Sequence, residues 1–458
     1  MKRFRKLIVA SALMAGVGFS SCESVLNILP PLDLANEAAL TNTRGLRTAL
    51  TGTFSPSGGL ADGSGVSGNV LTSGELWSDQ VQAQNPGFGQ LQIVNRNLNF
   101  FNDQGRPIWQ NGYGIINRAN NILDAIPTIT DAQIASEKNL IRGNALFLRA
   151  WAYFNLVRSF AQPWGFTADN THLGVILRLT PTRGSTGASK ARSTVAEVYA
   201  QIIKDLIEAE SLLPEASALP DFYNSFASKG AVAGLLARVY FQQNDFTNAA
   251  AAASRVISNS GYSLSDDVMD VFKNSPTPET IFQLISDDQS NSAGAVNGNF
   301  RQDDNDPPLF VDPAFATVIA ALPDADKRKV FVNERDGVTR TTKYDKLQMN
   351  VPLIRLPEML LIRAEATAQS AAASALADLN QIRRRAGLAP LTGLSGQALI
   401  DAIRRERSIE LCFEGDRFHE LKRTKQNIRA SAWNASSCIF KIPDVEVNAN
   451  TLCQQNPD

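Results

Sequence analysis

Side chains that could do chemistry are sparse in this chain, and none of them matches a common catalytic motif. The 458 residues contain only two histidines, His172 and His419, and neither lies in a cluster with the ligand spacing of a zinc site. The sequence has no G-x-S-x-G turn, no phosphate-binding loop and no dinucleotide fingerprint. We therefore predict a protein without a catalytic site, metal or cofactor, and we expect His419 at the surface.

Carboxylates are the exception, because a glycoside hydrolase needs only two of them. The candidates for such a pair, or for a structural calcium site, are Asp303, Asp304, Asp306, Asp324 and Asp326. The D-x-D spacing is common in solvated loops, however, and neither instance continues into a full set of EF-hand ligands. We predict that the protein is not an enzyme, and a structural calcium ion stays open.

Glycan binding needs flat aromatic rings that stack on sugars, with polar side chains at their edges. Trp77 is followed by Ser78 and Asp79, and Phe88 lies in a stretch rich in Gly and Gln. Both aromatic residues are candidates for ligand contact. The alternative is that they only anchor their own loops.

The elements that must position these groups are helices. Apolar residues recur at helical spacing in four pairs of segments, within 228–257, 357–387 and 399–423, and in 145–156 together with 198–213. This pattern predicts a mostly α-helical fold of four degenerate, tetratricopeptide-like helix pairs. Loop-rich insertions at about 55–105 and 260–345 are expected to form a second face, and their short strand-like runs do not predict a sheet-based domain.

The N-terminus reads as a secretory signal. Residues 1–21 combine four basic residues with a short apolar run, and Cys22 follows where a lipoprotein signal would place the lipidated cysteine. We predict a lipid anchor at Cys22 and a tether over 22–34; ordinary cleavage that releases a soluble protein is the alternative. Cleavage removes four of 44 basic residues and none of 45 acidic ones, and the resulting mild acidity argues against nucleic acid as a partner.

The segment 406–423, ERSIELCFEGDRFHELKR, is a helix that ends at Gly415 and restarts at Asp416. We expect Glu406, Arg407, Glu410 and Arg417 to form a partly buried ion network that locks the last helices together.

Cysteines near the C-terminus allow more than one arrangement. Cys438 and Cys453 could form a disulfide in an oxidising compartment, while a Cys412–Cys438 bond and a fully reduced set are alternatives. Cys412 itself lies between apolar residues of a predicted helix and is expected to be a buried thiol.

Several stretches together resemble one known family. They are 406–423, IPDVEVNAN at 442–450, the terminal QQNPD, and the runs 109–123, 145–160, 351–370 and 375–388. In this order they resemble the SusD/RagB family of surface lipoproteins. The resemblance implies a single SusD-like helical domain over 35–458, with its C-terminal signature at 351–458.

The same resemblance implies a function. It indicates a lipoprotein on the outer membrane, facing the exterior, that captures a nutrient oligomer, most simply an oligosaccharide, and delivers it to a SusC-like TonB-dependent transporter. A lipid-anchored glycoside hydrolase and a helical-repeat scaffold for envelope assembly are the alternatives.

Overall fold

The computed structural model describes residues 39–55, 66–184, 188–218, 226–273, 277–286, 294–301, 308–346 and 349–457. The predicted signal peptide, Cys22, the tether, and Asp303, Asp304 and Asp306 lie outside these residues. Within the described ranges, no helix combines the length and apolar character needed to cross a bilayer.

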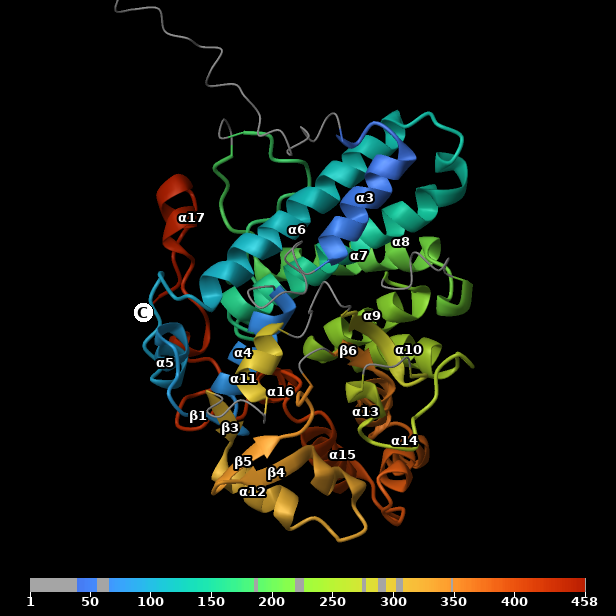
Figure 1. Cartoon of the computed structure of the whole chain (residues 1–458), viewed down its shortest axis with the longest axis vertical. Helices are drawn as coiled ribbons and strands as arrows, with labels where there is room; N and C mark the ends of the chain where they lie inside the picture. Colours follow the sequence, from blue (N-terminus) through green and yellow to red (C-terminus); the bar gives the residue numbers. More distant parts are fainter. Residues whose placement is uncertain are drawn as a thin grey trace, which may run out of the picture.

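Long helices form the scaffold and pack largely in chain order (Figure 1). They are α6 (Gly105–Ala125), α7 (Ile134–Phe160), α8 (Val195–Leu212), α9 (Lys229–Gln242), α10 (Phe246–Ile257), α13 (Leu356–Thr367), α14 (Ala372–Arg385) and α15 (Gly396–Glu410). The mostly helical fold is confirmed, and each predicted pair is present as two helices. In the last pair, however, α16 (Asp416–Arg423) packs chiefly on α4 (Val66–Trp77).

Local sequence explains where these helices begin. The side chains of Thr194, Ser228 and Asp245 accept hydrogen bonds from backbone N–H groups in the first turns of α8, α9 and α10. At Gly415, which separates α15 from α16, the backbone has φ +76° and a Cβ would lie 3.1 Å from the Cα of Leu71. Only glycine fits that position without strain.

The second insertion separates two scaffold helices in the chain but not in space. Helix α10 packs against α13 although the insertion lies between them in the chain. The insertion holds β2 (Thr280–Leu284), α11 (Gly294–Phe300), β3 (Leu309–Val311), α12 (Pro313–Ala320), β4 (Val332–Arg335) and β5 (Val338–Thr341), and β6 (Val351–Arg355) follows it. Among the described residues the strands form three antiparallel pairs, β1–β3, β2–β6 and β4–β5, so no large sheet is built there.

The first insertion is less irregular than its composition suggested. It contains α4, β1 (Val81–Ala83) and α5 (Phe88–Val94), and it follows α3 (Thr43–Phe54). Within this loop-rich stretch, α4 is a helix buried against α6, α7 and α16. Its small residues permit close packing: a Cβ on Gly74 would lie 3.4 Å from the carbonyl oxygen of Gly415. Strand β1 pairs with β3, and this pairing joins the two insertions.

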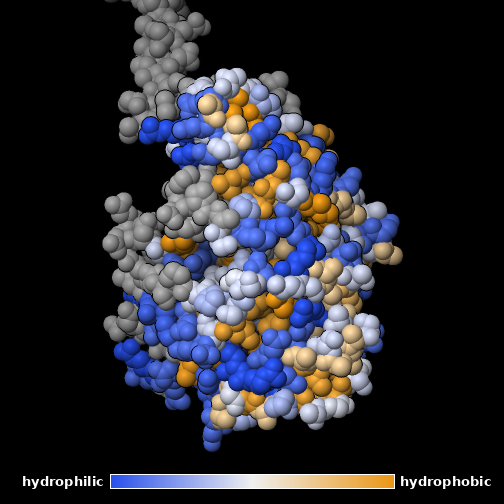
Figure 2. Space-filling view, turned by 90° about the vertical axis from the view of Figure 1, so that its right-hand side faces the viewer, coloured by the Kyte–Doolittle hydropathy of each residue, from blue (hydrophilic) through white to orange (hydrophobic). Residues whose placement is uncertain are grey.

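The remaining elements are short. They are α17 (Asp444–Ala449) and the 3-10 turns η3 (Ile126–Thr128), η4 (Ala216–Ala218), η6 (Asp270–Phe272), η7 (Lys327–Phe331) and η8 (Ser436–Cys438). On the face shown in Figure 2, apolar residues lie in separate groups between polar ones. The scaffold therefore shows a mixed surface there.

Candidate functional site

Exposed phenylalanines gather at one corner of the molecule. Helix α5 and the segment 98–104 carry Phe88, Phe100 and Phe101, which are 68%, 44% and 56% exposed. The Asn102 side chain donates to the Gly89 carbonyl at 3.0 Å and to the Gln92 side chain at 2.9 Å, so helix and segment form one unit. We call this unit, with its exposed phenylalanines, the aromatic corner.

Amide side chains surround the aromatic corner and tie it to the second insertion. Gln90 Nε2 donates to Asn299 Oδ1 of α11 at 2.6 Å, and Figure 1 shows α5 on the same side of the molecule as β1. The rings of Phe100 and Phe101 lie 4.5 Å apart at 53°. Gln90, Gln92 and Asn102 are buried and hydrogen-bonded within the protein, so the groups that the aromatic corner offers to a sugar are its exposed rings.

The structure contradicts one of the two predicted ligand contacts. Trp77 is only 2% exposed, because its indole stacks on Phe418 at 4.8 Å and packs against Phe440 at 4.7 Å. It anchors α4 to α16 and cannot meet a ligand at the surface. Phe88 is accessible and stays a candidate. Phe100 and Phe101 were missed, although two adjacent aromatics between asparagines were a usable signal.

The C-terminal charges do lie in a buried network, but with partners other than one another. The Glu410 carboxylate is fully buried and lies 2.5 Å from Arg385, 3.3 Å from Arg355 and 3.7 Å from Arg328. Burial by itself would raise the pKa of Glu410, yet the three guanidinium groups hold that pKa well below its usual range. Glu406 likewise pairs with Arg328 at 2.5 Å.

The two predicted arginines take different partners. Arg407 is 1% exposed and binds Asp416 through two hydrogen bonds of 2.9 and 2.6 Å. The Arg417 side chain instead donates two hydrogen bonds, of 2.8 and 2.7 Å, to Asp79, which lies outside the last helix pair. The network thus connects α15 and α16 to β6, α14, η7 and the end of α4, far beyond the last helix pair.

The remaining sequence predictions have clear outcomes. Cys412 is a buried thiol as expected. Cys438 and Cys453 are also free and buried, so the predicted disulfide is wrong in this structure.

His419 departs from expectation, and two of the candidate aspartates take part in ion pairs. His419 is 5% exposed and belongs to the interior, not the surface. Asp324 pairs with Lys329 at 2.9 Å, and Asp326 is buried and pairs with Arg328 at 2.8 Å, so these two carboxylates have structural partners. The part of the chain that the structure describes holds no group of three side chains that could bind a metal.

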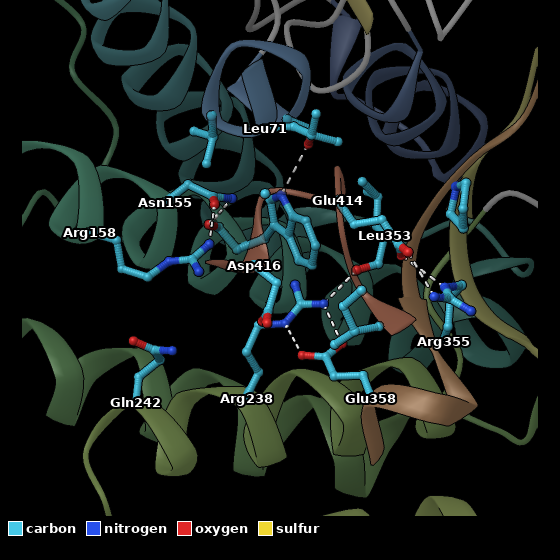
Figure 3. A pocket seen from close by; sticks show the side chains of 16 residues that line it. Leu71, Asn155, Arg158, Arg238, Gln242, Leu353, Arg355, Glu358, Glu414 and Asp416 are labelled. Atoms are coloured by element: carbon cyan, nitrogen blue, oxygen red, sulfur yellow. Dashed lines mark hydrogen bonds and ion pairs between the residues drawn. The ribbon is translucent and has the colours of Figure 1, made fainter. Parts of the chain in front are cut away.

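An interior cavity is too small for an oligomeric ligand. It measures about 70 Å³ and lies between α4, α7, α9, β6 and α16 (Figure 3). Charged groups along it pair with each other, such as Arg238 with Glu358 at 2.6 Å and Arg355 with Glu414 at 2.7 Å. Ligand pockets for small molecules are typically several hundred Å³, so this cavity does not hold a glycan.

Comparison with known proteins shows which family shares this sequence. Residues 75–241 match the family described as "Starch-binding associating with outer membrane", and residues 328–458 match the SusD family. The chain belongs to the SusD/RagB family. The aromatic corner lies within the first of these matches, and the buried ion network centres on the second.

Relatives resemble the protein along nearly its whole length. SusD-like protein P2 of Formosa agariphila is 26% identical over 93% of this chain and 91% of its own. A putative sugar binding protein from Bacteroides vulgatus has the same fold, with a TM-score of 0.82, 24% identity, and coverage of 92% of this chain and 99% of that one. A laminarin binding SusD-like protein follows at a TM-score of 0.74 and 23% identity, covering 91% and 99%. The last two are named as binding proteins.

Proposed function

We propose that the protein captures a glycan oligomer at the cell surface and delivers it to a SusC-like TonB-dependent transporter. The observation that carries the proposal is the aromatic corner, where Phe88, Phe100 and Phe101 are exposed on one unit that buried amide side chains hold together. Known relatives support the ligand class, since one is named for laminarin and contains the same fold.

Ring stacking gives the expected size of the effect. A stacked aromatic contributes about 1 kcal/mol beyond the area that it buries, which corresponds to a roughly fivefold change in affinity. Because Phe88 and Phe101 are exposed, truncating them should leave the core intact. Their loss should therefore weaken binding without changing the thermal midpoint of unfolding.

Calorimetric titration with a panel of oligosaccharides tests the ligand class and the surface together. We expect one glycan to bind the unlipidated protein, Phe88→Ala and Phe101→Ala to weaken it about fivefold each, and the double variant to weaken it about 25-fold. The matched control is Phe166→Ala, which removes a ring that is 41% exposed and packs against His172 instead. Wild-type affinity in the double variant would exclude the aromatic corner as the contact.

Delivery to a transporter requires a second experiment. In this proposal Cys22 carries the lipid anchor, and the scaffold helices supply packing surface for the transporter. A tagged protein purified from solubilised outer membranes should bring down a β-barrel transporter, and Cys22→Ala should leave the membrane fraction. Recovery of the lipoprotein alone would refute delivery while leaving glycan capture intact.

A further inference from the structure

A second, smaller cavity has an unusual set of walls. It measures about 20 Å³, and its lining includes Arg158 and Tyr199 from the scaffold and His419 and Lys422 from α16. None of its lining residues is an aspartate or a glutamate. A cavity of this size admits a water molecule or a small ion.

Two of the cations at this cavity, Arg158 and Lys422, form no ion pair within the described residues, although the charges of Glu358 and Asp416 act on Arg158 at longer range. Arg158 donates one hydrogen bond, to Asn155 at 2.8 Å, and its buried Nε has no partner. Lys422 is 3% exposed, and its Nζ donates to the Cys438 carbonyl at 3.0 Å. A third cation, Arg423, differs because it pairs with Glu420 and Glu365.

Neutral donors complete the lining. His419 is 5% exposed, and its Nε2 is buried without a partner. Burial, and after it the charges of Arg158 and Lys422, hold the pKa of His419 well below its usual range, so the ring is neutral at pH 7 and one of its nitrogens can donate. Burial raises the pKa of Tyr199, so its hydroxyl remains protonated.

Buried cations without counter-charge are costly, since each loses its hydration without an ion pair in return. Consistent with this cost, burial lowers the pKa of Arg158 to about 9 and that of Lys422 to about 8. Aromatic rings offset part of the cost, with Phe154 at 4.1 Å from Arg158 and Phe418 at 5.0 Å from Lys422. A small anion would supply the missing charge.

We propose that this cavity binds a small inorganic anion of chloride size, held by Arg158, Lys422 and His419. The bound ion would join α7 to α16 and so stabilise the packing of the C-terminal segment on the scaffold. This inference is independent of the glycan and of the transporter.

Anomalous diffraction is the direct test. Crystals of the unlipidated protein grown in sodium bromide should show an anomalous peak in the cavity, within contact of Arg158 and Lys422. The same crystals grown in gluconate should show none. A cavity that holds only water in the presence of bromide would overturn the proposal.

Unfolding measurements test the energetic role. When chloride replaces gluconate at constant ionic strength, the thermal midpoint of the wild type should rise by about 1–2 °C. Arg158→Gln should abolish the rise, whereas the control Arg142→Gln, on the same helix but paired with Glu208, should keep it. An unchanged wild-type midpoint would also overturn the proposal.

A second variant, which adds a negative charge to the cavity, keeps the proposal testable if Arg158→Gln fails to fold. Gln242 lines the cavity, and Figure 3 shows its side chain beside that of Arg158. Gln242→Glu should make the midpoint independent of chloride and keep it, in gluconate, at or above that of the wild type. A Gln242→Glu protein that still responds to chloride as the wild type does would contradict the site.

Discussion

Replacing Glu410 by Gln should destabilise the protein more than almost any other change of a single charge. The carboxylate has no exposed area and lies between Arg385, Arg355 and Arg328. Glutamine keeps the volume and one acceptor oxygen but removes the charge. The three guanidinium groups would then share only the remaining carboxylates around them.

The size of the expected loss in the free energy of unfolding follows from the burial of Glu410. Removing one partner of a buried ion pair typically costs about 3–5 kcal/mol, because the other charge stays buried without compensation. Since glutamine still accepts a hydrogen bond, we expect a decrease of about 3 kcal/mol in the free energy of unfolding. The control is Asp124→Asn, whose partner Arg183 is 60% exposed in its side chain, and we expect it to cost at most about 1 kcal/mol.

Urea denaturation followed by tryptophan fluorescence measures both variants, and pH gives a second check. The folded-state pKa of Glu410 is depressed, so its contribution is fully present above the unfolded pKa of about 4.3 and is lost as pH falls toward the folded value. The difference between wild type and Glu410→Gln should therefore be constant above about pH 5 and shrink below it.

Two results would refute this reasoning. One is a Glu410→Gln protein within 1 kcal/mol of the wild type at pH 7, which would mean that the arginines find compensation elsewhere. The other is a stability difference between wild type and Glu410→Gln that grows on acidification, because it would mean that the folded-state pKa of Glu410 is raised and not lowered.

Three further predictions concern other buried positions. Burial raises the pKa of Glu75 to about 8, so the free energy of unfolding should fall as pH rises from about 4.3 to 8. Glu75→Gln should remove that slope and gain stability at pH 8, by at most about 5 kcal/mol, in urea titrations. Gly415→Ala should lower the free energy of unfolding by about 1–2 kcal/mol in the same assay, because φ at this position is +76°. The control Gly114→Ala, inside α6 with nothing within 4 Å of its Cβ, should raise it by about 0.5–1 kcal/mol. Equal effects of the two substitutions would contradict the backbone argument. Cys438 and Cys453 should both react with a thiol reagent after unfolding without reductant, and a reductant-sensitive unfolding midpoint would show that a disulfide forms after all.

Local patterns in the sequence were sufficient for the scaffold. The spacing of apolar residues within one or two helical turns defines a helix and its buried side, so the paired segments appear as α7 to α10 and α13 to α16. The break at Gly415 was equally local, because a left-handed residue between two helices has few substitutes. The order of short motifs also indicated the family correctly.

Contacts between distant segments could not be read from the sequence. Trp77 and Phe88 lie in similar polar surroundings in the chain, yet Trp77 is buried because α16 and the segment of Phe440 fold over it. The partners of Glu410 come from positions 328, 355 and 385, and no spacing along the chain relates them. Composition had also suggested a loop where α4 is buried.

The sequence by itself determined the helical scaffold, the family and the absence of any familiar catalytic motif. The tertiary structure alone decided which aromatics remain open to a ligand, which charges are paired, and that Lys422 is buried beside Arg158 with no acid in the lining of their cavity. The physical reason is range: helix formation depends on neighbours within a few residues, whereas burial and charge compensation depend on where the insertions and the C-terminal segment return to the scaffold.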